Sequence, residues 1–436
     1  MTRRERVTRG TQFGSVMRWL AVPAVLLCAI GSAYAQTSGP VDDGRAAPQE
    51  APNTGTATTE APKTETPNTE APKAETPAEP QAQGTSSTFD GFKVGGFVFK
   101  PGGRIKLDII RDFSAITSED SFDTRTIAVD GSDGSNSNLH AKETRLSIDI
   151  RGPVEGKELK MYVETDFYGS SSVLRLRQAY GSYGGLLAGQ AWSTFVDESN
   201  FPTTIDFEAP TAFPQVRQAQ ARWTSKLGAK GSWSVAVEDN KSSIQIPTAI
   251  EGKAEYPMPD LVTNFRYVAS RWHGQASFFL GEARFRPKEG NNDDVTLWGG
   301  LLSAKTKTFG RDNVYGQYTF GDGVGRYRGG VTAVPDANNQ LHAVGLNAFM
   351  GGYEHFWSSR YSSNLVYSVV TAPDKSFYPD TFNKRLDYGA VNLLYWFLPD
   401  RAWVGVEYLY GRREVMGGDT GTAHRLQFAI RFNLPS

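Results

Sequence analysis

The chain has 436 residues, of which 39% are hydrophobic and 21% charged, with 45 Gly and a single Cys. Its 46 basic and 47 acidic residues nearly balance, so no bulk positive charge supports nucleic-acid binding. The mean hydropathy of −0.42 argues against a bundle of membrane-spanning helices. One cysteine excludes a disulfide framework and any zinc or iron–sulfur site that needs several thiolates.

Residues 1–35 have the pattern of a secretory signal peptide. Arginines near the N-terminus precede an apolar stretch from Trp19 to Ile30, and Ala33-Tyr34-Ala35 supplies the small residues of a cleavage site after Ala35. The apolar stretch is short of the roughly 20 residues that a spanning helix needs. Cys28 lies within it and leaves a lipoprotein signal as an alternative, although Leu27 stands where such signals require a small residue.

Residues 36–88 are rich in Pro, Thr, Glu and Ala and contain a near repeat, Thr59–Asn68 followed by Thr69–Ala78. The evenly spaced prolines prevent a continuous helix, and the absence of aromatic residues leaves nothing to bury. We therefore expect a disordered tether. It is a plain spacer or, as the alternative, attaches to a cell-wall polymer or to an envelope partner.

From Phe89 onward, apolar and polar residues alternate as they do in strands with one apolar face. Clear examples are Ile105–Ile109, Leu146–Ile150 and Leu426–Phe432. A soluble sandwich could show the same alternation in any one strand, so the connections must decide the fold. Sixteen segments can be marked, and they begin near residues 94, 142, 158, 173, 186, 216, 232, 260, 274, 295, 312, 342, 359, 384, 401 and 422.

The connections between these segments alternate in length, apart from one brief link at 169–172. Short turns at one end and long polar loops at the other are typical of an outer-membrane barrel with an even strand number. We predict an all-β protein, a 16-stranded antiparallel transmembrane β-barrel over residues 89–436, closed because hydrocarbon cannot satisfy an open sheet edge. The short turns are expected at 151–157, 183–185, 227–231, 270–274, 308–312, 357–360 and 398–401, and the long loops at 114–140, 193–214, 239–259, 282–294, 321–341, 371–383 and 412–423.

Sixteen strands enclose an aqueous channel, and an even number puts both ends of the barrel on the short-turn side. The tether is therefore expected in the periplasm. Aromatic residues that suit an interfacial girdle lie near strand ends, at Phe356, Trp357, Tyr395, Trp396, Phe397, Trp403, Tyr408 and Tyr410.

The polar faces of the clearer strands define the expected lumen, where basic residues outnumber acidic ones. Such a lining favours anions, because a narrow channel with low-dielectric walls strengthens the field. The alternative is that several of these charges pair across strands and cancel. The basic residues are Arg104, Lys106, Arg145, Arg151, Lys160, Arg175, Arg177, Arg222, Arg266, Arg425 and Arg431, and the acidic ones are Asp108, Asp149, Glu164, Asp166 and Glu407.

One long loop, Ser193 to Pro214, differs from the others because it combines carboxylates with residues typical of a core. An exterior loop has no need of so many apolar side chains, so we expect it to fold into the barrel and form a constriction whose carboxylates oppose the arginines. Packing on the rim or on a neighbouring subunit is the alternative. The carboxylates are Asp197, Glu198, Asp206 and Glu208, and the apolar residues are Phe195, Phe201, Ile205, Phe207 and Phe213.

No pattern in the sequence favours an enzyme, a cofactor or a metal. The five histidines, at positions 140, 273, 342, 355 and 424, show no metal-binding spacing. A Ser-His-Asp trio that assembles in space remains a minor alternative.

Residues 175–195 and the acidic segment Asp206-Phe207-Glu208-Ala209-Pro210 resemble the DcaP-like porins of Gram-negative outer membranes. The segments Gly103–Asp108 and Arg425–Phe428 are similar too, and the likeness covers residue 89 to the end. This resemblance implies a homotrimer of 16-stranded barrels that passes small anionic solutes such as dicarboxylates, with lumenal arginines at the constriction.

Two features depart from that family. The prolines between Pro40 and Pro80 exclude the coiled-coil extension that helps some members to trimerise. The chain continues past Phe432 instead of ending in Phe, so recognition by the assembly machinery is expected to use Phe428, Ile430 and Phe432.

The sequence thus predicts a trimeric outer-membrane diffusion porin with a preference for anions, in contact with membrane lipid and not with nucleic acid. A structural envelope protein, whose barrel anchors the membrane while the tether reaches the cell wall, is the alternative. The residues expected at the pore lining and constriction are Arg104, Arg145, Arg175, Arg177, Arg222, Arg266, Arg425, Arg431, Asp197, Glu198, Asp206 and Glu208.

Overall fold

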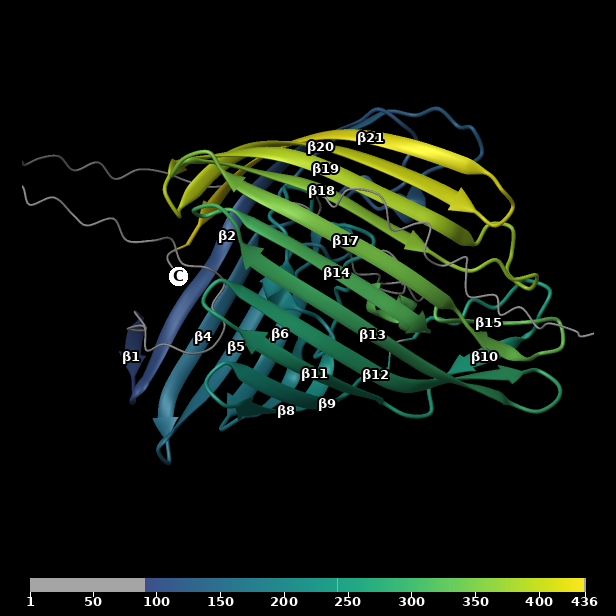
Figure 1. Ribbon diagram of the computed structural model, residues 1–436, viewed down its shortest axis with the longest axis horizontal. Coiled ribbons are helices and arrows are strands. Elements are labelled where there is room, and N and C mark those ends of the chain that lie inside the picture. The colour runs from purple at the N-terminus through teal and green to yellow at the C-terminus, as the bar shows by residue number, and fades with distance from the viewer. Residues whose placement is uncertain (1–90, 241, 329, 435–436) are drawn as a thin grey trace, which may run out of the picture. The chain divides into compact units, whose positions relative to one another are not determined.

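The structure, a computed structural model, describes residues 91–240, 242–328 and 330–434 (Figure 1). The expected signal peptide and tether lie outside the described residues. Sixteen antiparallel strands form a closed wall, because the last strand, β21, pairs with the first strand of the wall, β2, from Arg104↔Asn433 to Asp112↔Arg425. The prediction of a 16-stranded antiparallel barrel is confirmed.

Every wall strand begins within three residues of its predicted start. The strands of the wall are β2 (Phe97–Asp112), β4 (Arg145–Val154), β5 (Lys157–Asp166), β6 (Arg175–Tyr183), β7 (Leu186–Trp192), β8 (Arg217–Leu227), β9 (Gly231–Glu238), β11 (Asp260–Val268), β12 (Trp272–Pro287), β13 (Asp293–Lys307), β14 (Asn313–Asp322), β17 (Gly345–Phe356), β18 (Tyr361–Thr371), β19 (Asn383–Leu398), β20 (Ala402–Val415) and β21 (Thr420–Asn433).

Five short strands and four 3-10 helices complete the described residues. The strand β3 continues the line of β4 beside β2, and β10 extends the wall beside β12. No helix among the described residues is long and apolar enough to cross a membrane. These elements are β1 (Phe92–Val94), β3 (Asn136–His140), β10 (Gly252–Glu255), β15 (Ala333–Pro335), β16 (Leu341–Ala343), η1 (Thr124–Thr126), η2 (Ser170–Ser172), η3 (Glu198–Asn200) and η4 (Val324–Arg328).

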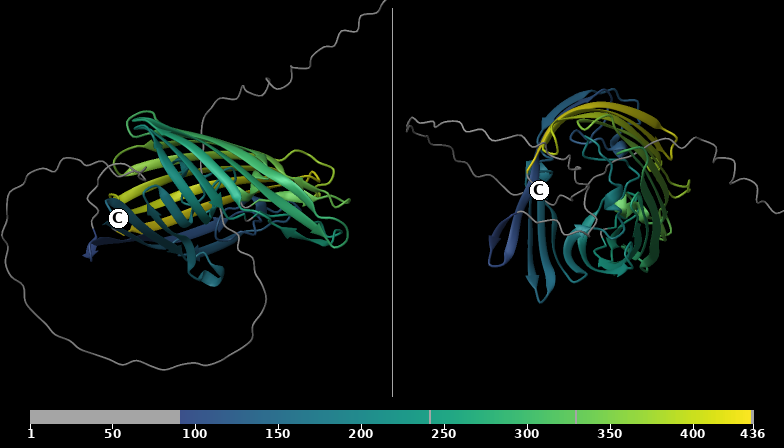
Figure 2. Two further views of the ribbon diagram at one scale, coloured as in Figure 1. Left: turned by 90° about the horizontal axis from the view of Figure 1, so that it is seen from below. Right: turned by 60° about the vertical axis from the view of Figure 1, so that its left-hand side comes forward.

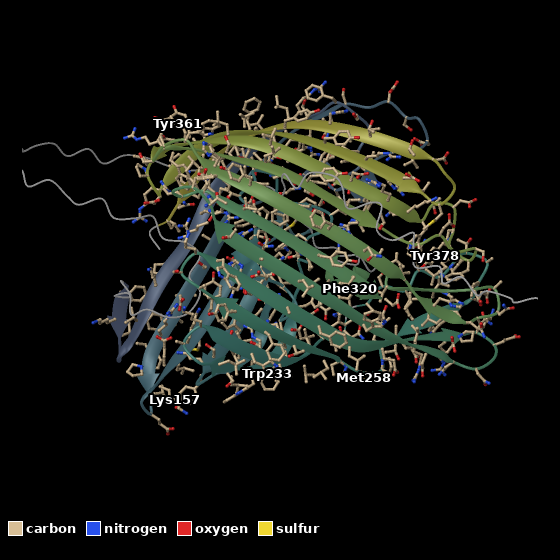
Figure 3. All side chains as sticks on the ribbon, in the orientation of Figure 1. Lys157, Trp233, Met258, Phe320, Tyr361 and Tyr378 are labelled. Carbon is tan, nitrogen blue, oxygen red and sulfur yellow. The ribbon has the colours of Figure 1, made fainter. Side chains whose placement is uncertain are left out.

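The side chains alternate between the two faces of the wall as the sequence pattern predicts. On β21, Phe428 and Phe432 are exposed on the outer face, whereas Arg425 and Gln427 are buried on the inner face. Figure 3 labels Trp233 and Tyr361 among the side chains on the wall. Such alternation gives each strand an apolar outer side and a polar inner side.

The aromatic residues near the short turns divide between the two faces. Trp357 is exposed, and Tyr361 stacks on Tyr395 with ring centroids 4.8 Å apart. Trp403, expected in the girdle, is instead buried, and the Arg431 guanidinium lies 5.4 Å from its ring centroid. Successive side chains of a strand point to opposite faces, and Val404 lies on the outer face, so Trp403 must point inward.

Two of the predicted long loops are mostly strand. β12 and β13 remain paired up to Phe285↔Asp293, and β20 and β21 up to Glu414↔Thr420. The polar residues that suggested loops at 282–294 and 412–423 belong to hairpins that extend beyond the apolar part of the wall.

Three of the described loops pack inside the barrel, where the sequence predicted one. They are the η1 loop (residues 113–135), the η3 loop (193–216) and the η4 loop (323–344). Phe195 of the η3 loop packs against Phe279 of the wall and Tyr327 of the η4 loop, and Phe122 of the η1 loop packs against Tyr388 of the wall. The right-hand view of Figure 2 shows segments inside the ring of strands.

Candidate functional site

The η3 loop leaves β7 and runs along the inner surface of the wall, and Asp197 makes its first anchor. This carboxylate is fully buried and accepts hydrogen bonds from Arg266 (2.6 Å) and Ser303 (2.7 Å), and it lies 3.0 Å from the His273 ring nitrogen Nε2. Burial alone would raise its pKa, but His273 and Arg266 hold the pKa of Asp197 down to about 2. Asp197 therefore fastens the loop to β11, β12 and β13.

The middle of the loop is held by amide and hydroxyl groups. The Thr203 hydroxyl donates to Glu354 on β17 (2.8 Å), and the Thr203 carbonyl oxygen accepts from Asn364 on β18 (2.9 Å) and Asn392 on β19 (2.8 Å). Asn200 donates to the Gly316 carbonyl oxygen on β14 (3.0 Å). The loop is thus bonded in turn to successive strands of one half of the wall.

The far end of the loop is bonded around Ile205 and Asp206. Glu407 on β20 accepts the backbone N–H groups of Ile205 (3.1 Å) and Asp206 (2.8 Å), and Lys106 on β2 donates to the Ile205 carbonyl oxygen. The Asp206 carboxylate lies 3.5 Å from Arg425 Nη1. Burial raises the pKa of Asp206 to about 6, although Arg425 opposes the shift.

Glu208 connects the η3 loop to the η1 loop rather than to the wall. It is buried and accepts from Arg125 (3.2 Å) and Ser121 (3.2 Å). Burial, reinforced by the nearby Asp123 carboxylate, raises the pKa of Glu208.

Of the four carboxylates expected at the constriction, only Glu198 has an exposed side chain. The other three, Asp197, Asp206 and Glu208, are turned away from open water and hold the loop in place. The start of the η3 loop is bonded to Glu238 on β9 and Gln220 on β8, and its other anchors lie on β11 to β21 and on β2. The inner faces of β4 to β6 and the rest of β8 are left as the opposite side of the passage.

That opposite side carries the arginine pair on β6. Arg175 is bonded to Asp166 (2.7 Å), and Arg177 to Glu164 (2.6 Å) and Asp166 (2.8 Å), both acids on β5. The register between β5 and β6 shifts at Glu164 and Thr165, so Arg177 is an inserted residue. A β-bulge of this kind re-aims side chains, and here it lets Arg175 and Arg177 both reach the inner carboxylates.

A second basic group lies on β2 and β4. Arg104 is paired with Glu143, a buried residue just before β4, and Arg145 lies 3.9 Å from the same carboxylate. Lys106 also pairs with Glu143 and is itself buried. Three basic side chains thus share one glutamate.

The remaining predicted arginines have different surroundings. Arg425 is fully buried and is bonded to Asp112 (2.6 Å), and Arg266 is committed to Asp197, so both anchor loops instead of facing open water. Arg431 lies over Trp403 and donates to Asn433 (2.8 Å). Arg222 is half-buried on β8 and has no ion pair within the described part of the chain.

Sequence reasoning missed Arg217 at the start of β8. Strand alternation would send it outward with Ala219 and Ala221, but β7 and β8 part from β6 at this level. Its guanidinium lies 4.5 Å from the Trp192 ring centroid and within electrostatic range of Arg145, Arg175 and Arg177. No local signal could have found it, because its position depends on where three strands separate.

An aromatic contact joins the η3 loop to the basic side. Phe207 stacks on Tyr168, which follows β5, with ring centroids 3.8 Å apart. The Arg175 guanidinium lies 5.6 Å from the Tyr168 centroid and 5.7 Å from that of Phe207. The loop therefore touches both sides of the lumen and narrows it beside Arg175.

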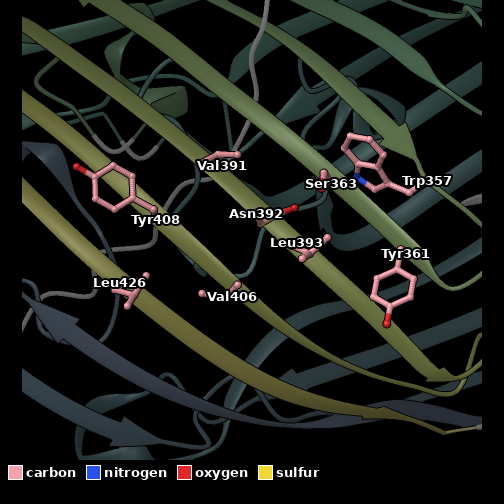
Figure 4. Close-up of a pocket in the computed structure, with 9 residues that line it drawn as sticks. All are labelled: Trp357, Tyr361, Ser363, Val391, Asn392, Leu393, Val406, Tyr408 and Leu426. Atoms are coloured by element: carbon pink, nitrogen blue, oxygen red, sulfur yellow. Dashed lines mark hydrogen bonds between the residues drawn. The ribbon is translucent and has the colours of Figure 1, made fainter.

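A separate groove of about 560 Å³ lies on the outer face, away from this passage (Figure 4). It is lined by apolar side chains of β18 to β21, among them Val391, Leu393 and Val406, with Tyr361 and Tyr408 at its rim. Its position excludes it from the path through the barrel. Within the described residues, no cluster of three or more His, Cys, Asp or Glu side chains could hold a metal ion.

Known proteins share this architecture. The sequence profile of the DcaP outer membrane protein family matches residues 79–434. The crystal structure of the outer membrane channel DcaP of Acinetobacter baumannii superposes with a TM-score of 0.71 at 22% identity, over 79% of this chain and 99% of that one. An anion-selective porin from Comamonas acidovorans gives a TM-score of 0.54 at 9% identity, over 78% of this chain and 100% of that one.

A loop-deletion mutant of the Vibrio cholerae outer membrane protein OmpT gives a TM-score of 0.52 at 11% identity, over 78% of this chain and all of that one. A search of curated protein sequences found no match. At these identities the structural likeness establishes the fold, and the family profile carries the assignment to a family.

Proposed function

The chain belongs to the DcaP outer membrane protein family, and we propose on that basis that it is a passive diffusion porin that prefers small anions, dicarboxylates in particular. The resemblance expected from residues 175–210 is confirmed, and the protein is an outer-membrane β-barrel of a channel family rather than an enzyme. The proposed preference for anions is supported by the charged residues of the passage.

The proposal rests on one observation: the charged side chains on one side of the passage are mostly buried in contacts, whereas basic side chains predominate on the other side. On the η3 loop, three of the four carboxylates are buried in anchoring contacts, so they contribute little negative field to the water in the lumen. The opposite side, from β2 to β8, carries six lumenal arginines together with Arg151, Lys106 and Lys160, against the five carboxylates Asp108, Glu143, Asp149, Glu164 and Asp166. A further carboxylate on β2, Asp112, is bonded to Arg425. Such an excess of fixed cations attracts anions into a narrow channel. The arginines are Arg104, Arg145, Arg175, Arg177, Arg217 and Arg222.

The geometry of guanidinium groups supports carboxylates as the preferred anions. A guanidinium presents parallel N–H donors that match both oxygens of a carboxylate. Arg217 and Arg222, both on β8, form no ion pair among the described residues, although Glu164 and Glu198 lie within electrostatic range of them, and their N–H donors are therefore available to a solute. Guanidinium groups with available N–H donors suit a small solute that carries carboxylates.

We also propose a homotrimer whose N-terminal tether lies in the periplasm. Leu434 donates its N–H to the Gly103 carbonyl oxygen, and Asn433 to that of Arg401 in the short turn between β19 and β20. The C-terminal residues and the start of the wall therefore lie together at the short-turn end. Short turns face the periplasm in outer-membrane barrels, which supports a tether on that side.

The test is the reversal potential of the purified protein in planar bilayers under a salt gradient. We expect a potential that shows anion preference, and a cation-selective value would contradict the proposal. In the double variant Arg217→Gln, Arg222→Gln the anion-to-cation permeability ratio should fall roughly threefold, because two available positive charges are lost. The matched control is Arg286→Gln, which removes an exposed arginine at the loop end of β12 and should leave the ratio unchanged.

A further inference from the structure

The apolar groove on the outer face of β18 to β21 follows from the register of these strands (Figure 4). Ser363 on β18 lies opposite Leu393 on β19, which in turn lies opposite Val406 on β20. The three side chains point outward and form a low row across the sheet. Larger side chains stand on either side of the row, because Tyr361 comes two residues before Ser363 and Tyr408 two residues after Val406.

The walls of this groove are held by side-chain contacts. The Trp357 indole N–H donates to the Ser363 hydroxyl oxygen (2.9 Å), and the Trp357 ring packs edge-on against His355 with centroids 4.2 Å apart. The Tyr408 hydroxyl lies 2.6 Å from the His424 ring nitrogen Nδ1. These contacts satisfy polar groups that hydrocarbon cannot satisfy. The groove is therefore preformed, which lowers the entropy cost of holding a flexible ligand in it.

The size and lining of the groove suit one acyl chain. Its volume is about 560 Å³, and none of the described residues that line it is charged. From β18 to β21 it crosses three strand spacings, which is about 14 Å. The hydrocarbon of one membrane leaflet is about 15 Å deep, half of the roughly 30 Å core. The groove therefore fits within a single leaflet.

The short-turn end of the same side of the wall is basic. Four neighbouring short turns, which join β11 to β12, β13 to β14, β17 to β18 and β19 to β20, each contain an exposed arginine. Of the carboxylates in these turns, Asp312 is buried and accepts from the Tyr353 hydroxyl (2.6 Å), and Asp400 is exposed. Basic residues at a membrane surface attract anionic lipid headgroups. The arginines are Arg271, Arg311, Arg360 and Arg401.

Two of these arginines belong to the turns of the strands that form the groove. Arg360 directly precedes Tyr361, and its carbonyl oxygen accepts from the Trp396 N–H (2.8 Å), which fixes the turn against β19. Arg401 lies in the next turn, before β20. Neither side chain forms an ion pair with another described residue. Guanidinium groups donate parallel N–H bonds that match two oxygens of a phosphate.

We propose that the groove and these two arginines form a binding site for an anionic glycerophospholipid. One acyl chain lies in the groove, and the phosphate of the headgroup accepts from Arg360 and Arg401. Short turns face the periplasm in outer-membrane barrels, so the lipid belongs to the periplasmic leaflet. The inference goes beyond the proposed passage of solutes and does not depend on the preference of the channel for anions.

The first experiment measures lipid binding by native mass spectrometry of the purified protein in detergent. Phosphatidylglycerol and phosphatidylcholine with the same acyl chains are titrated separately. We expect at least fivefold tighter binding of phosphatidylglycerol, and a loss of most of this difference in the double variant Arg360→Gln, Arg401→Gln. The matched control, Arg271→Gln with Arg311→Gln, removes the same charge from turns beside the groove and should keep the difference. Equal affinity for the two lipids in the wild type would overturn the proposal.

A second pair of variants tests the groove itself. Val406→Trp places a large side chain in the groove and should weaken the binding of phosphatidylglycerol at least fivefold. Val314→Trp adds the same side chain on the outer face of β14, where Val314 is exposed, and should leave binding unchanged. Unchanged binding in Val406→Trp would overturn the groove as the site of the acyl chain.

Competition with glycerol 3-phosphate separates the lipid from a free phosphate ester. We expect no displacement of phosphatidylglycerol at equal concentration, because the ester has no acyl chain for the groove. Displacement would show that the arginines bind the phosphate alone and would overturn the proposal. The reversal potential of the wild type tests the proposed function separately, so either proposal can fail without the other.

Discussion

The two halves of the lumen use the same kinds of charged residue in different ways. Along β9 to β21, the η3 loop lies against the wall, and charges such as Asp197, Arg266 and Arg425 are buried with partners. Along β4 to β8 the loop has one anchor, Gln220 on β8, and Arg177 is buried with its carboxylate partners. Arg145 and Arg175 keep part of their surface open while they share a few carboxylates.

The difference shows that a polar residue on an inward face is not by itself a pore residue. Removing one partner of a buried ion pair costs about 3–5 kcal/mol, whereas a partly exposed pair contributes about 1 kcal/mol or less. Changes in the loop-covered half should therefore alter stability and the width of the passage. Changes in the open half should alter selectivity.

The largest effect is expected from breaking the far anchor of the η3 loop with Glu407→Ala. This change leaves the N–H groups of Ile205 and Asp206 and the amide of Asn392 without their acceptor, at a cost of about 3 kcal/mol. We expect a lower midpoint of thermal unfolding and a roughly twofold larger single-channel conductance, since the loop moves out of the passage. Glu407→Gln keeps an acceptor oxygen, so its unfolding midpoint and its conductance should lie between those of the wild type and those of Glu407→Ala. A conductance equal to that of the wild type would show that the other anchors hold the loop.

In the open half, the double change Arg175→Gln, Arg177→Gln should have the largest effect on selectivity. It removes two positive charges and leaves Glu164 and Asp166 without their arginines. The anion-to-cation permeability ratio, measured from the reversal potential, should fall about tenfold. Arg266→Gln in the covered half is the control, and it should affect thermal stability more than selectivity. An unchanged potential in the double variant would mean that these arginines act only as wall contacts.

Within the loop, Asp206 and Asp197 should respond to pH with opposite signs. Burial raises the pKa of Asp206 to about 6, so the free energy of unfolding should fall as the pH rises from about 4 to 6, by up to about 3 kcal/mol. The pKa of Asp197 is lowered to about 2, so its stabilisation is present above about pH 4 and is lost as the pH falls toward 2. Unfolding of Asp206→Asn and Asp197→Asn from pH 2 to 7 measures both. Asp206→Asn should flatten the fall above pH 4, and an unaltered slope there would contradict the assignment.

The smallest effect is expected from Glu198→Gln. Glu198 is the one carboxylate of the four that is exposed, and its removal should raise the anion-to-cation permeability ratio by about 1.5-fold. The reversal potential measures this, with Asp374→Asn at the exposed loop between β18 and β19 as the control. A fall in the ratio would show that Glu198 lies outside the passage.

Much of the fold could be predicted from local pattern. The alternation around Leu426–Phe432 requires one apolar and one polar face, and short turns such as Trp357–Arg360 require antiparallel neighbours. The alternation and the short turns each involve only a few consecutive residues, so both can be recognised without knowledge of the rest of the molecule. They were sufficient for the strand number and for the start of each strand.

The sequence by itself therefore determined the barrel, because membrane hydrocarbon and strand geometry act on each strand separately. Only the tertiary structure decided which charges face water. Arg425 is covered because three loops enter the lumen, Arg177 is turned inward by a bulge, and Arg217 reaches the passage because β7 and β8 leave β6. The covering of Arg425 depends on residues far apart in the chain, such as Ser118, whose carbonyl oxygen accepts from Arg425, and the other two outcomes depend on how neighbouring strands pair and separate. No periodicity along the chain records them.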